Sequence, residues 1–150
     1  METYWHQIEI TDPTALSGPS LSRLIGLLVR ELPVKHIVVN RAEGSAPRFA
    51  DLFSDMMELD PADLVDRASQ VTQFDWGDFF LIEGSDALAT CGPNSGYREI
   101  LPRTLAAVRA VDDTYFYVYT PDSKAAAAVR RTYPDAKHSM RVMDALEFPD

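Results

Sequence analysis

Residues 114–143 read TYFYVYTPDSKAAAAVRRTYPDAKHSMRVM, and this stretch decides the fold class. Aromatic and β-branched residues fill Thr114–Thr120, which predicts a strand with three tyrosines on one face. We expect these tyrosines in the core, with Tyr119 the most exposed because it lies near the strand end. An aspartate before an alanine-rich run predicts a capped helix over Ser123–Tyr133, which a proline ends, and Ala136–Met143 follows as a strand. A helix between two strands indicates a layered α/β domain.

The remaining sequence repeats this alternation of helices and strands. Apolar residues recur at helical spacing between Leu21 and Leu32 and form one stripe, as in a helix that packs on a sheet. Asp60 followed by a proline is a strong helix start. The other expected elements are strands over Tyr4–Ile10, Val34–Asn40 and Ala87–Cys91, and helices over Ser20–Leu32, Pro47–Leu59, Pro61–Ser69 and Pro102–Val111.

One segment, Gln70–Glu83, contains strand residues in an ambiguous register. Either it forms one long strand in which Phe74 and Trp76 point inward, or a turn over Asp75–Asp78 separates two strands. Because helices lie between strands along the whole chain, residues 1–150 are predicted to form a single layered α/β domain. Its helices would pack on a mixed sheet of five or six strands.

The composition is that of a globular protein in a reducing compartment. The 150 residues are typical of one domain, and 46% are hydrophobic and 25% charged. Cys91 is the only cysteine, so the chain forms no intramolecular disulfide. The first residues lack the basic and apolar segments of a secretory signal, and no apolar run approaches the roughly 20 residues of a membrane span. We therefore expect a cytoplasmic protein that has no membrane partner.

The net charge of −9 arises from one third of the chain. Between residues 43 and 87, eleven acidic residues stand against two arginines, whereas acids and bases outside this segment cancel. On the helix expected over residues 47–59, Asp51, Asp55 and Glu58 lie at i, i+4 and i+7, so their like charges repel and folding gains nothing from them. This acidic face is either a solvated face kept for solubility or a binding surface.

Aromatic residues in the same segment favour a binding surface. Trp76 is flanked by Asp75 and Asp78 and followed by two phenylalanines. An apolar anchor surrounded by charges is typical of a protein-binding hot spot. The pI near 4.7 argues against nucleic acid as a direct partner, because phosphate binding needs lysines and arginines on the contacting face. A basic protein is the expected partner, and the predicted partner-binding residues are Asp51, Asp55, Glu58, Asp75, Trp76 and Asp78.

One loop invites comparison with a catalytic motif. Cys91-Gly-Pro-Asn-Ser-Gly-Tyr-Arg98 resembles the phosphate loop of the cysteine phosphatases, in which an arginine follows the reactive cysteine by six residues. Here Arg98 follows by seven, and Thr90 stands where that family has a histidine. A catalytic thiolate also needs a cationic setting, and nothing else nearby supplies one. We interpret the segment as a turn after a buried cysteine and predict no enzyme activity.

No metal or other cofactor is predicted. The histidines His6, His36 and His138 fall on expected strands without the spacing of a metal site, so we expect them partly buried and bonded to neighbours. Three further aspartates are spaced by three residues, which spreads them around a helix, and the glycine-centred pattern of a calcium loop is missing. These aspartates are Asp60, Asp63 and Asp66.

These features together favour a small non-catalytic protein that binds and neutralises a basic protein partner. In size, localised acidity, α/β architecture and lack of catalytic motifs the chain is similar to the bacterial immunity proteins, small acidic domains that block a cognate toxin. The resemblance implies a toxin domain as partner and carries over no functional residue. A concentrated carboxylate face would also meet such a partner with fast, steered association.

Two other functions stay open. The first is an enzyme or small-ligand protein with its pocket at the carboxyl ends of the strands, where open α/β sheets place ligands. The second is a subunit that forms a homodimer through the aromatic strand. The polar residues of the pocket would be Asn40, Arg41, Asn94, Ser95 and Arg98.

Overall fold

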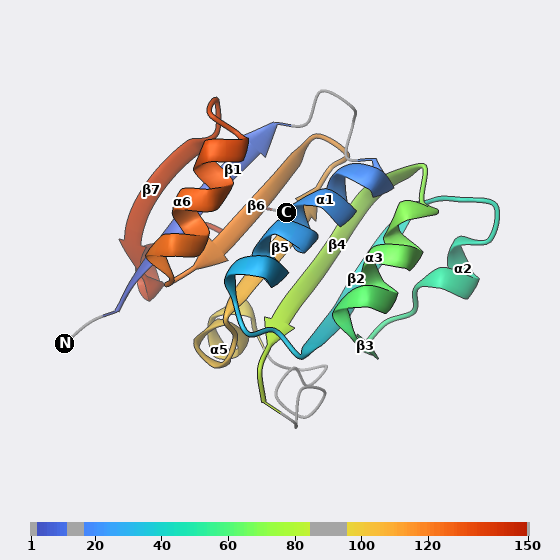
Figure 1. The fold of residues 1–150 in the computed structure, drawn as a ribbon, viewed down its shortest axis with the longest axis horizontal. Coiled ribbons are helices and arrows are strands. Elements are labelled where there is room, and N and C mark those ends of the chain that lie inside the picture. The colour runs from blue at the N-terminus through green and yellow to red at the C-terminus, as the bar shows by residue number, and fades with distance from the viewer. Residues whose placement is uncertain (1–2, 12–16, 85–95, 150) are drawn as a thin grey trace.

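A computed structural model describes residues 3–11, 17–84 and 96–149 (Figure 1). The strands are β1 (Tyr4–Thr11), β2 (His36–Ser45), β3 (Met57–Leu59), β4 (Gln73–Ile82), β5 (Ala106–Val111), β6 (Tyr115–Thr120) and β7 (Lys137–Val142). The α-helices are α1 (Gly18–Glu31), α2 (Phe49–Leu52), α3 (Pro61–Ser69), α5 (Tyr97–Ile100) and α6 (Ser123–Thr132). Short 3-10 turns occupy η1 (Leu101–Arg103) and η2 (Met143–Ala145).

All seven strands form one sheet in the order β3-β2-β4-β5-β6-β1-β7. Every neighbouring pair is antiparallel. The α/β class is confirmed, and the expected mixed sheet of five or six strands is wrong. Helix α6 links β6 to β7, but β1 lies between these two strands, and β2 likewise separates β3 from β4, which α3 links. The two strands that each helix joins are parallel to each other, but an antiparallel strand lies between them. The sheet therefore has no parallel neighbours among the described strands.

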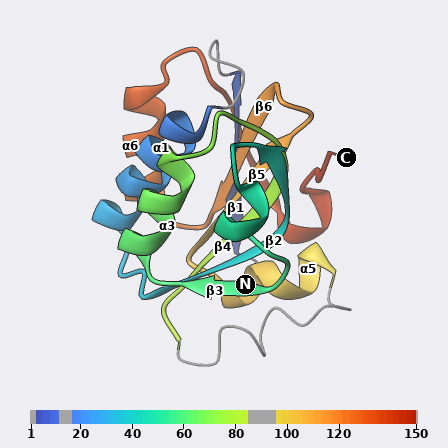
Figure 2. The same cartoon turned by 90° about the vertical axis from the view of Figure 1, so that its right-hand side faces the viewer.

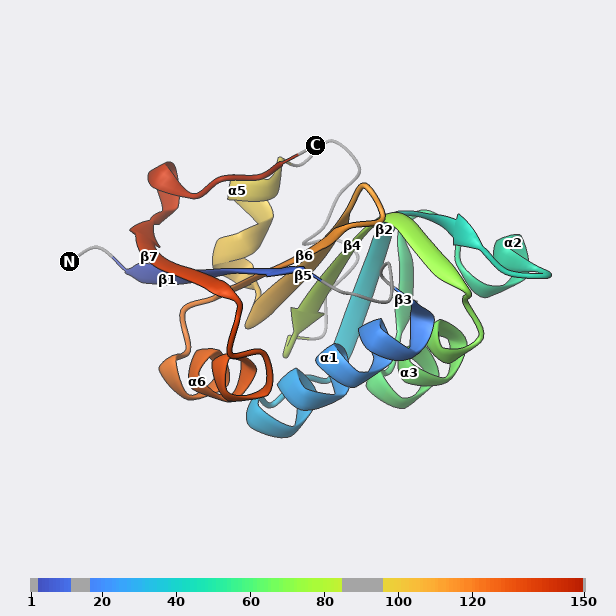
Figure 3. The same cartoon turned by 90° about the horizontal axis from the view of Figure 1, so that it is seen from above.

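Helices cover the two faces of the sheet unequally. Helices α1, α3 and α6 lie side by side on one face, which we call the helical face (Figures 2 and 3). Helix α5, η1 and the C-terminal residues 143–149 lie on the other, which we call the tail face. Each face has its own apolar core: Leu24, Leu28 and Phe79 belong to the first, and Phe80 and Tyr119 to the second.

Helices α3 and α6 begin at the predicted residues, and α1 begins two residues before the predicted Ser20. The Asp60 carboxylate accepts a hydrogen bond from the Asp63 backbone N–H at 2.8 Å and caps α3. Asp122 does the same for Ala125 at 2.8 Å and caps α6. Helix α1 begins at Gly18, capped by the Ser17 hydroxyl, and Leu21, Leu24, Ile25 and Leu28 are fully enclosed against the sheet.

The helix predicted over Pro47–Leu59 is wrong. Helix α2 is a single turn, and residues 57–59 form the edge strand β3 beside β2. Met56 between them has a φ of 57°, a left-handed conformation that ends any helix. Phe53 is buried against Phe74 and Phe79 of β4, so tertiary packing of aromatic rings outweighs helical periodicity here.

The helix predicted over Pro102–Val111 is also wrong. The proline lies in η1, and residues 106–111 form β5, a central strand whose six residues are all buried. Ala106, Ala107 and Ala110 read as helix formers in the sequence. In the sheet their small side chains leave room for elements packed on both faces, so context overrides propensity.

Gln70–Glu83 contains one long strand, β4, as the first of the two interpretations had it. The register with β2 shifts twice, between Asn40 and Glu43 and between Glu43 and Gly44. Phe74 consequently packs in the helical-face core and Trp76 against the tail-face core. Both side chains therefore pack against a core, as this interpretation expects, but on opposite faces, and Trp76 is only partly buried. The strand predicted over Ala87–Cys91 lies outside the described residues.

The described helices include none that is both long enough and apolar enough to cross a membrane.

Candidate functional site

The structure does not place the three predicted acids of residues 47–59 on one helix. Asp51 lies in α2, Asp55 in the following turn and Glu58 on β3, and all three are exposed. Asp55 accepts a hydrogen bond from the backbone N–H of Arg41 at 3.0 Å, which ties this turn to β2. The predicted helical stripe is therefore wrong, because three different segments carry the three acids.

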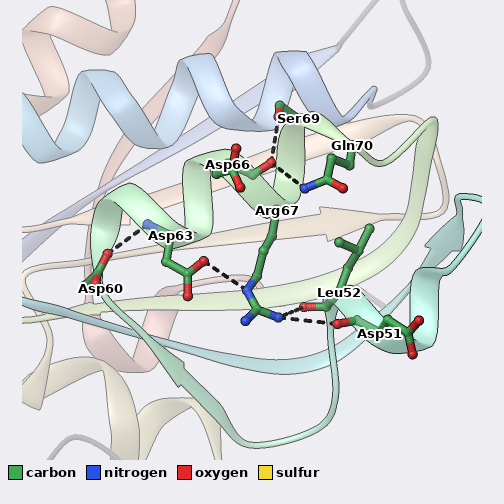
Figure 4. Close-up of polar contacts among 8 residues, drawn as sticks. All are labelled: Asp51, Leu52, Asp60, Asp63, Asp66, Arg67, Ser69 and Gln70. Carbon is green, nitrogen blue, oxygen red and sulfur yellow. Dashed lines mark hydrogen bonds and ion pairs between the residues drawn. The ribbon is translucent and has the colours of Figure 1, made fainter.

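Acids of α3 hold the local structure together. Figure 4 shows Arg67 between α3 and α2: its Nε is 3.1 Å from Asp63 Oδ1, and its Nη1 donates to the Leu52 carbonyl at 2.9 Å. The same Nη1 reaches the Asp51 carbonyl at 3.4 Å. Asp60 caps the helix, as described above. Asp60 and Asp63 thus have structural partners.

Asp78 lies inside the protein and does not reach the predicted binding surface. Its side chain is 8% exposed, and its Oδ1 is 3.4 Å from Nε of Arg109, whose side chain is 7% exposed. The Arg109 guanidinium also lies 5.1 Å from the ring centroid of Tyr97 on α5. Asp78 and Arg109 therefore form a buried ion pair between β4 and β5 on the tail face.

Trp76 and Asp75 occupy a different position, where β4 is bulged. Trp76 is partly buried against the tail-face core, and its cross-strand neighbours are Glu43 on β2 and Val111 on β5. Directly opposed residues of an antiparallel pair present their side chains on the same face, so Glu43 and Trp76 share the tail face. This end of the sheet therefore combines an aromatic ring with adjacent negative charge.

Two aspartates from another part of the sequence join this end. Asp112 and Asp113 form the β5–β6 turn, are exposed, and both have a φ of 50°. The backbone N–H of Asp113 donates to the Asp75 carbonyl at 3.1 Å. The Gln73 amide donates to Asp75 Oδ1 at 3.0 Å and to Asp113 Oδ2 at 3.3 Å, so one side chain holds two carboxylates together. We call the assembly around Trp76 the acidic end; its carboxylates are Glu43, Asp55, Asp75, Asp112 and Asp113.

Sequence reasoning missed Glu43, Asp112 and Asp113 as members of this site. A signal for the last two was present, because consecutive aspartates between strand-forming residues are typical of a hairpin turn with positive φ. The helix predicted over residues 102–111 concealed that signal. Glu43 joins the site through the register of β2 with β4, which the sequence alone does not specify.

A row of polar residues crosses the tail face, two residues along β4 from Trp76. Asp78, Arg109, Tyr117, Glu9 and Lys137 are successive cross-strand neighbours from β4 to β7. The Tyr117 hydroxyl donates to Glu9 Oε1 at 2.6 Å, and Lys137 Nζ lies 3.5 Å from Glu9 Oε2. Burial and the hydrogen bond to Glu9 raise the pKa of Tyr117 far above its usual value. The hydroxyl is thus a permanent donor, which fits a structural role.

The tyrosines on β6 belong to the core, as predicted, but their order of exposure differs from the prediction. Tyr119 is fully enclosed, so the prediction that it is the most exposed of the three is wrong. Its ring packs against Tyr97 and Phe148, and its hydroxyl donates to the Glu147 carbonyl at 2.6 Å. The C-terminal segment covers it, a contact that a strand pattern does not reveal.

Two of the three histidines meet on adjacent strands. His6 Nδ1 and His138 Nε2 are 2.8 Å apart, and His6 Nε2 is 3.3 Å from the Ser123 hydroxyl of α6. Burial first, and the charge of Arg130 second, lower the pKa of both rings. The pair therefore stays neutral at physiological pH, with one ring donating and the other accepting. Within the described ranges, no group of three or more histidine, cysteine or acidic side chains is arranged to hold a metal ion.

The polar residues of the alternative pocket do not come together in the part of the chain that is described. The carboxyl-end rule applies to parallel strands, and this sheet is antiparallel throughout. Arg98 donates to the carbonyls of Met143 and Leu146 and so holds the C-terminal segment. Asn40 and Arg41 lie beside the bulge of β2. Asn94, Ser95 and the turn after Cys91 lie outside the described residues.

The aromatic strand does not offer an edge for dimerisation. Strand β6 pairs with β5 on one side and β1 on the other, so its backbone is already used on both sides. The outer strands of the sheet are β3 and β7. A dimer through strand pairing would therefore use one of these two.

No known protein family, curated protein or solved structure matches this chain.

Proposed function

We propose that this chain is a non-catalytic binding protein whose acidic end docks on a basic surface of a partner protein and neutralises it, as an immunity protein blocks its toxin. One observation carries the proposal: carboxylates from four separate segments meet at the end of the sheet where β4 carries the half-buried Trp76. Glu43 pairs with Trp76 across the strands, Asp55 bonds to β2, and Gln73 holds Asp75 and Asp113 together. Such convergence brings like charges together, which costs folding energy rather than supplying it. A binding role explains why that cost is retained.

The acidic end combines the two parts of a protein-binding site. Exposed carboxylates of one sign raise the association rate with a cationic partner by roughly 10–10³-fold through long-range steering. Trp76 supplies an apolar ring whose contact area slows dissociation, and tryptophan is enriched among such anchors. Asp75 is fixed by Gln73, so its carboxylate is ordered before the partner arrives.

A charge-neutralised variant tests the acidic end directly. Glu43→Gln, Asp112→Asn and Asp113→Asn are combined, because asparagine adopts the positive φ of residues 112 and 113 as readily as aspartate. A matched control removes three exposed acids elsewhere, through Glu31→Gln, Asp66→Asn and Asp135→Asn, and gives the same net charge.

Affinity capture from source cells compares these two variants with the wild-type protein. A basic protein retained by wild type and control but lost by the Glu43, Asp112 and Asp113 variant supports the proposal. Association rates are then measured with the purified partner. The rate for the Glu43, Asp112 and Asp113 variant should be about tenfold or more below that of the wild-type protein. The wild-type rate should fall as salt is added. Equal retention by all three proteins, or equal rates at low salt, contradicts the proposal.

A further inference from the structure

Strand β7 is an outer strand of the sheet, and among the described residues its one partner strand is β1 (Figure 1). It spans six residues, whereas the opposite outer strand, β3, spans three. Proteins usually shorten or cover such edges, because unpaired backbone groups attract another strand. The longer edge, β7, is therefore the better place for an added strand.

Exposed apolar side chains collect at this same edge. Among the described residues, Tyr4 and Met140 are the large hydrophobic side chains that are exposed, at 56% and 54%. Met140 is the cross-strand neighbour of His6, and Tyr4 is that of Val142, so all four side chains lie on the helical face. Apolar exposure is thus concentrated beside the unpaired backbone.

The cations of β7 are already neutralised within the chain. Lys137 Nζ lies 3.5 Å from Glu9 Oε2, and Arg141 Nη2 lies 3.0 Å from Glu147 Oε1. Both pairs point to the tail face, away from Met140. The edge presents little net charge of its own, which suits a neutral, self-complementary partner better than an acidic one.

We propose that a second copy of this chain pairs with β7 in antiparallel orientation, with Met140 opposite Met140 of the second copy. This register sets Ser139 against Arg141 and His138 against Val142 across the two-fold axis. Centring the axis on Ser139 instead would place Lys137 opposite Arg141, and like charges directly opposed are destabilising. The Met140 register avoids that repulsion and buries the exposed methionine against itself.

The charge distribution also selects β7 over β3. The acidic end lies around β2, β4 and the β5–β6 turn, and its nearest strand, β6, is two strand spacings, about 10 Å, from β7. In a dimer through β7 each copy contributes this separation, and the two β7 strands add one spacing more. Pairing through β7 keeps the two acidic ends far beyond the roughly 8 Å over which exposed charges interact at physiological salt. Pairing through β3 would bring Glu58 and its acidic neighbours of both copies together.

Light scattering with sedimentation velocity over a range of concentrations tests the association. The wild-type protein should form a dimer as its concentration rises, and Met140→Lys should shift it to monomer. Ala62→Lys, which adds the same charge at an exposed position of α3, should leave the dimer intact. A wild-type protein that stays monomeric throughout, or an unchanged dimer in Met140→Lys, overturns the proposal.

Cross-linking then tests the register. In the Cys91→Ser background, Met140→Cys places two thiols opposite each other at a Cβ separation of about 5 Å, close to what a disulfide needs. Tyr4→Cys is equally exposed but lies one strand further from the axis, so it should cross-link far more slowly. Equal rates for the two variants overturn the register. The charge-neutralised Glu43, Asp112 and Asp113 variant should dimerise like wild type, so this proposal and the proposed function fail independently.

Discussion

Removing one partner of the Asp78–Arg109 pair should destabilise the protein strongly. In Arg109→Met the carboxylate of Asp78 stays buried without its cation, which in other proteins costs about 3–5 kcal/mol. Both side chains are less than a tenth exposed, so solvent does not screen the loss. The Nε–Oδ1 distance of 3.4 Å is longer than the 2.7–2.9 Å of a strong charge-assisted bond. We therefore expect about 3 kcal/mol, at the lower end of the range.

Urea unfolding followed by tryptophan fluorescence measures this loss. Asp78→Asn should cost a similar amount, and the double variant should lose less than the two single variants together, by about 1 kcal/mol or more. Arg103→Met, an exposed arginine on η1, serves as the control and should change stability by less than about 0.5 kcal/mol. Losses below about 1 kcal/mol in both single variants, or strict additivity, would refute the ion-pair reasoning.

Three further predictions concern other parts of the molecule. Leu24→Ala and Leu28→Ala should each cost about 2–5 kcal/mol in urea unfolding, because both side chains are fully enclosed beneath α1; losses under about 1 kcal/mol would contradict that packing. The folded protein lowers the pKa values of His6 and His138. Below about pH 6.5 the unfolded chain therefore binds more protons at these histidines than the folded protein does. The stability that is present above that pH is lost as the pH falls. A His6→Gln/His138→Gln protein should show a flatter loss between about pH 7 and pH 5 than wild type, and an unchanged slope would exclude the pair as its source. Trp76→Ala should leave the association rate with the basic partner near wild type and raise the dissociation rate; the reverse pattern would argue against an apolar anchor.

Local signals in the sequence predicted the elements they control. The caps at Asp60 and Asp122 fix helix starts through hydrogen bonds that span three residues, so no distant contact is needed to predict them. The apolar stripe from Leu21 to Leu28 has helical spacing, and this segment is a helix. The aromatic residues of β6 alternate as in a strand, and this segment is a strand. These features are local, and a single sequence contains them in full.

Features set by distant contacts escaped prediction. The alanines of β5 form a strand because β4 and β6 bond to them on both sides, although alanine favours helices. The sequence predicts that Asp78 belongs to an acidic surface, because only the pairing of β4 with β5 shows that Arg109 lies beside it. The acidic end shows the same dependence, since Asp113 reaches Asp75 only through the hairpin that follows β5.

The bulge in β4 determines which side chains of this strand enter the helical-face core and which lie at the acidic end. In a regular strand, Phe74 and Trp76 would share a face, because side chains alternate with a period of two. The extra residue, Asp75, lets Phe74 fill the helical-face core while Trp76 lies on the tail face beside Glu43. The register shift also leaves Asp75 partly exposed beside Gln73, where its carboxylate joins that of Asp113. Bulges are frequent beside functional sites because they re-aim side chains. The irregularity that made Gln70–Glu83 ambiguous in sequence is therefore the same one that positions the proposed binding residues.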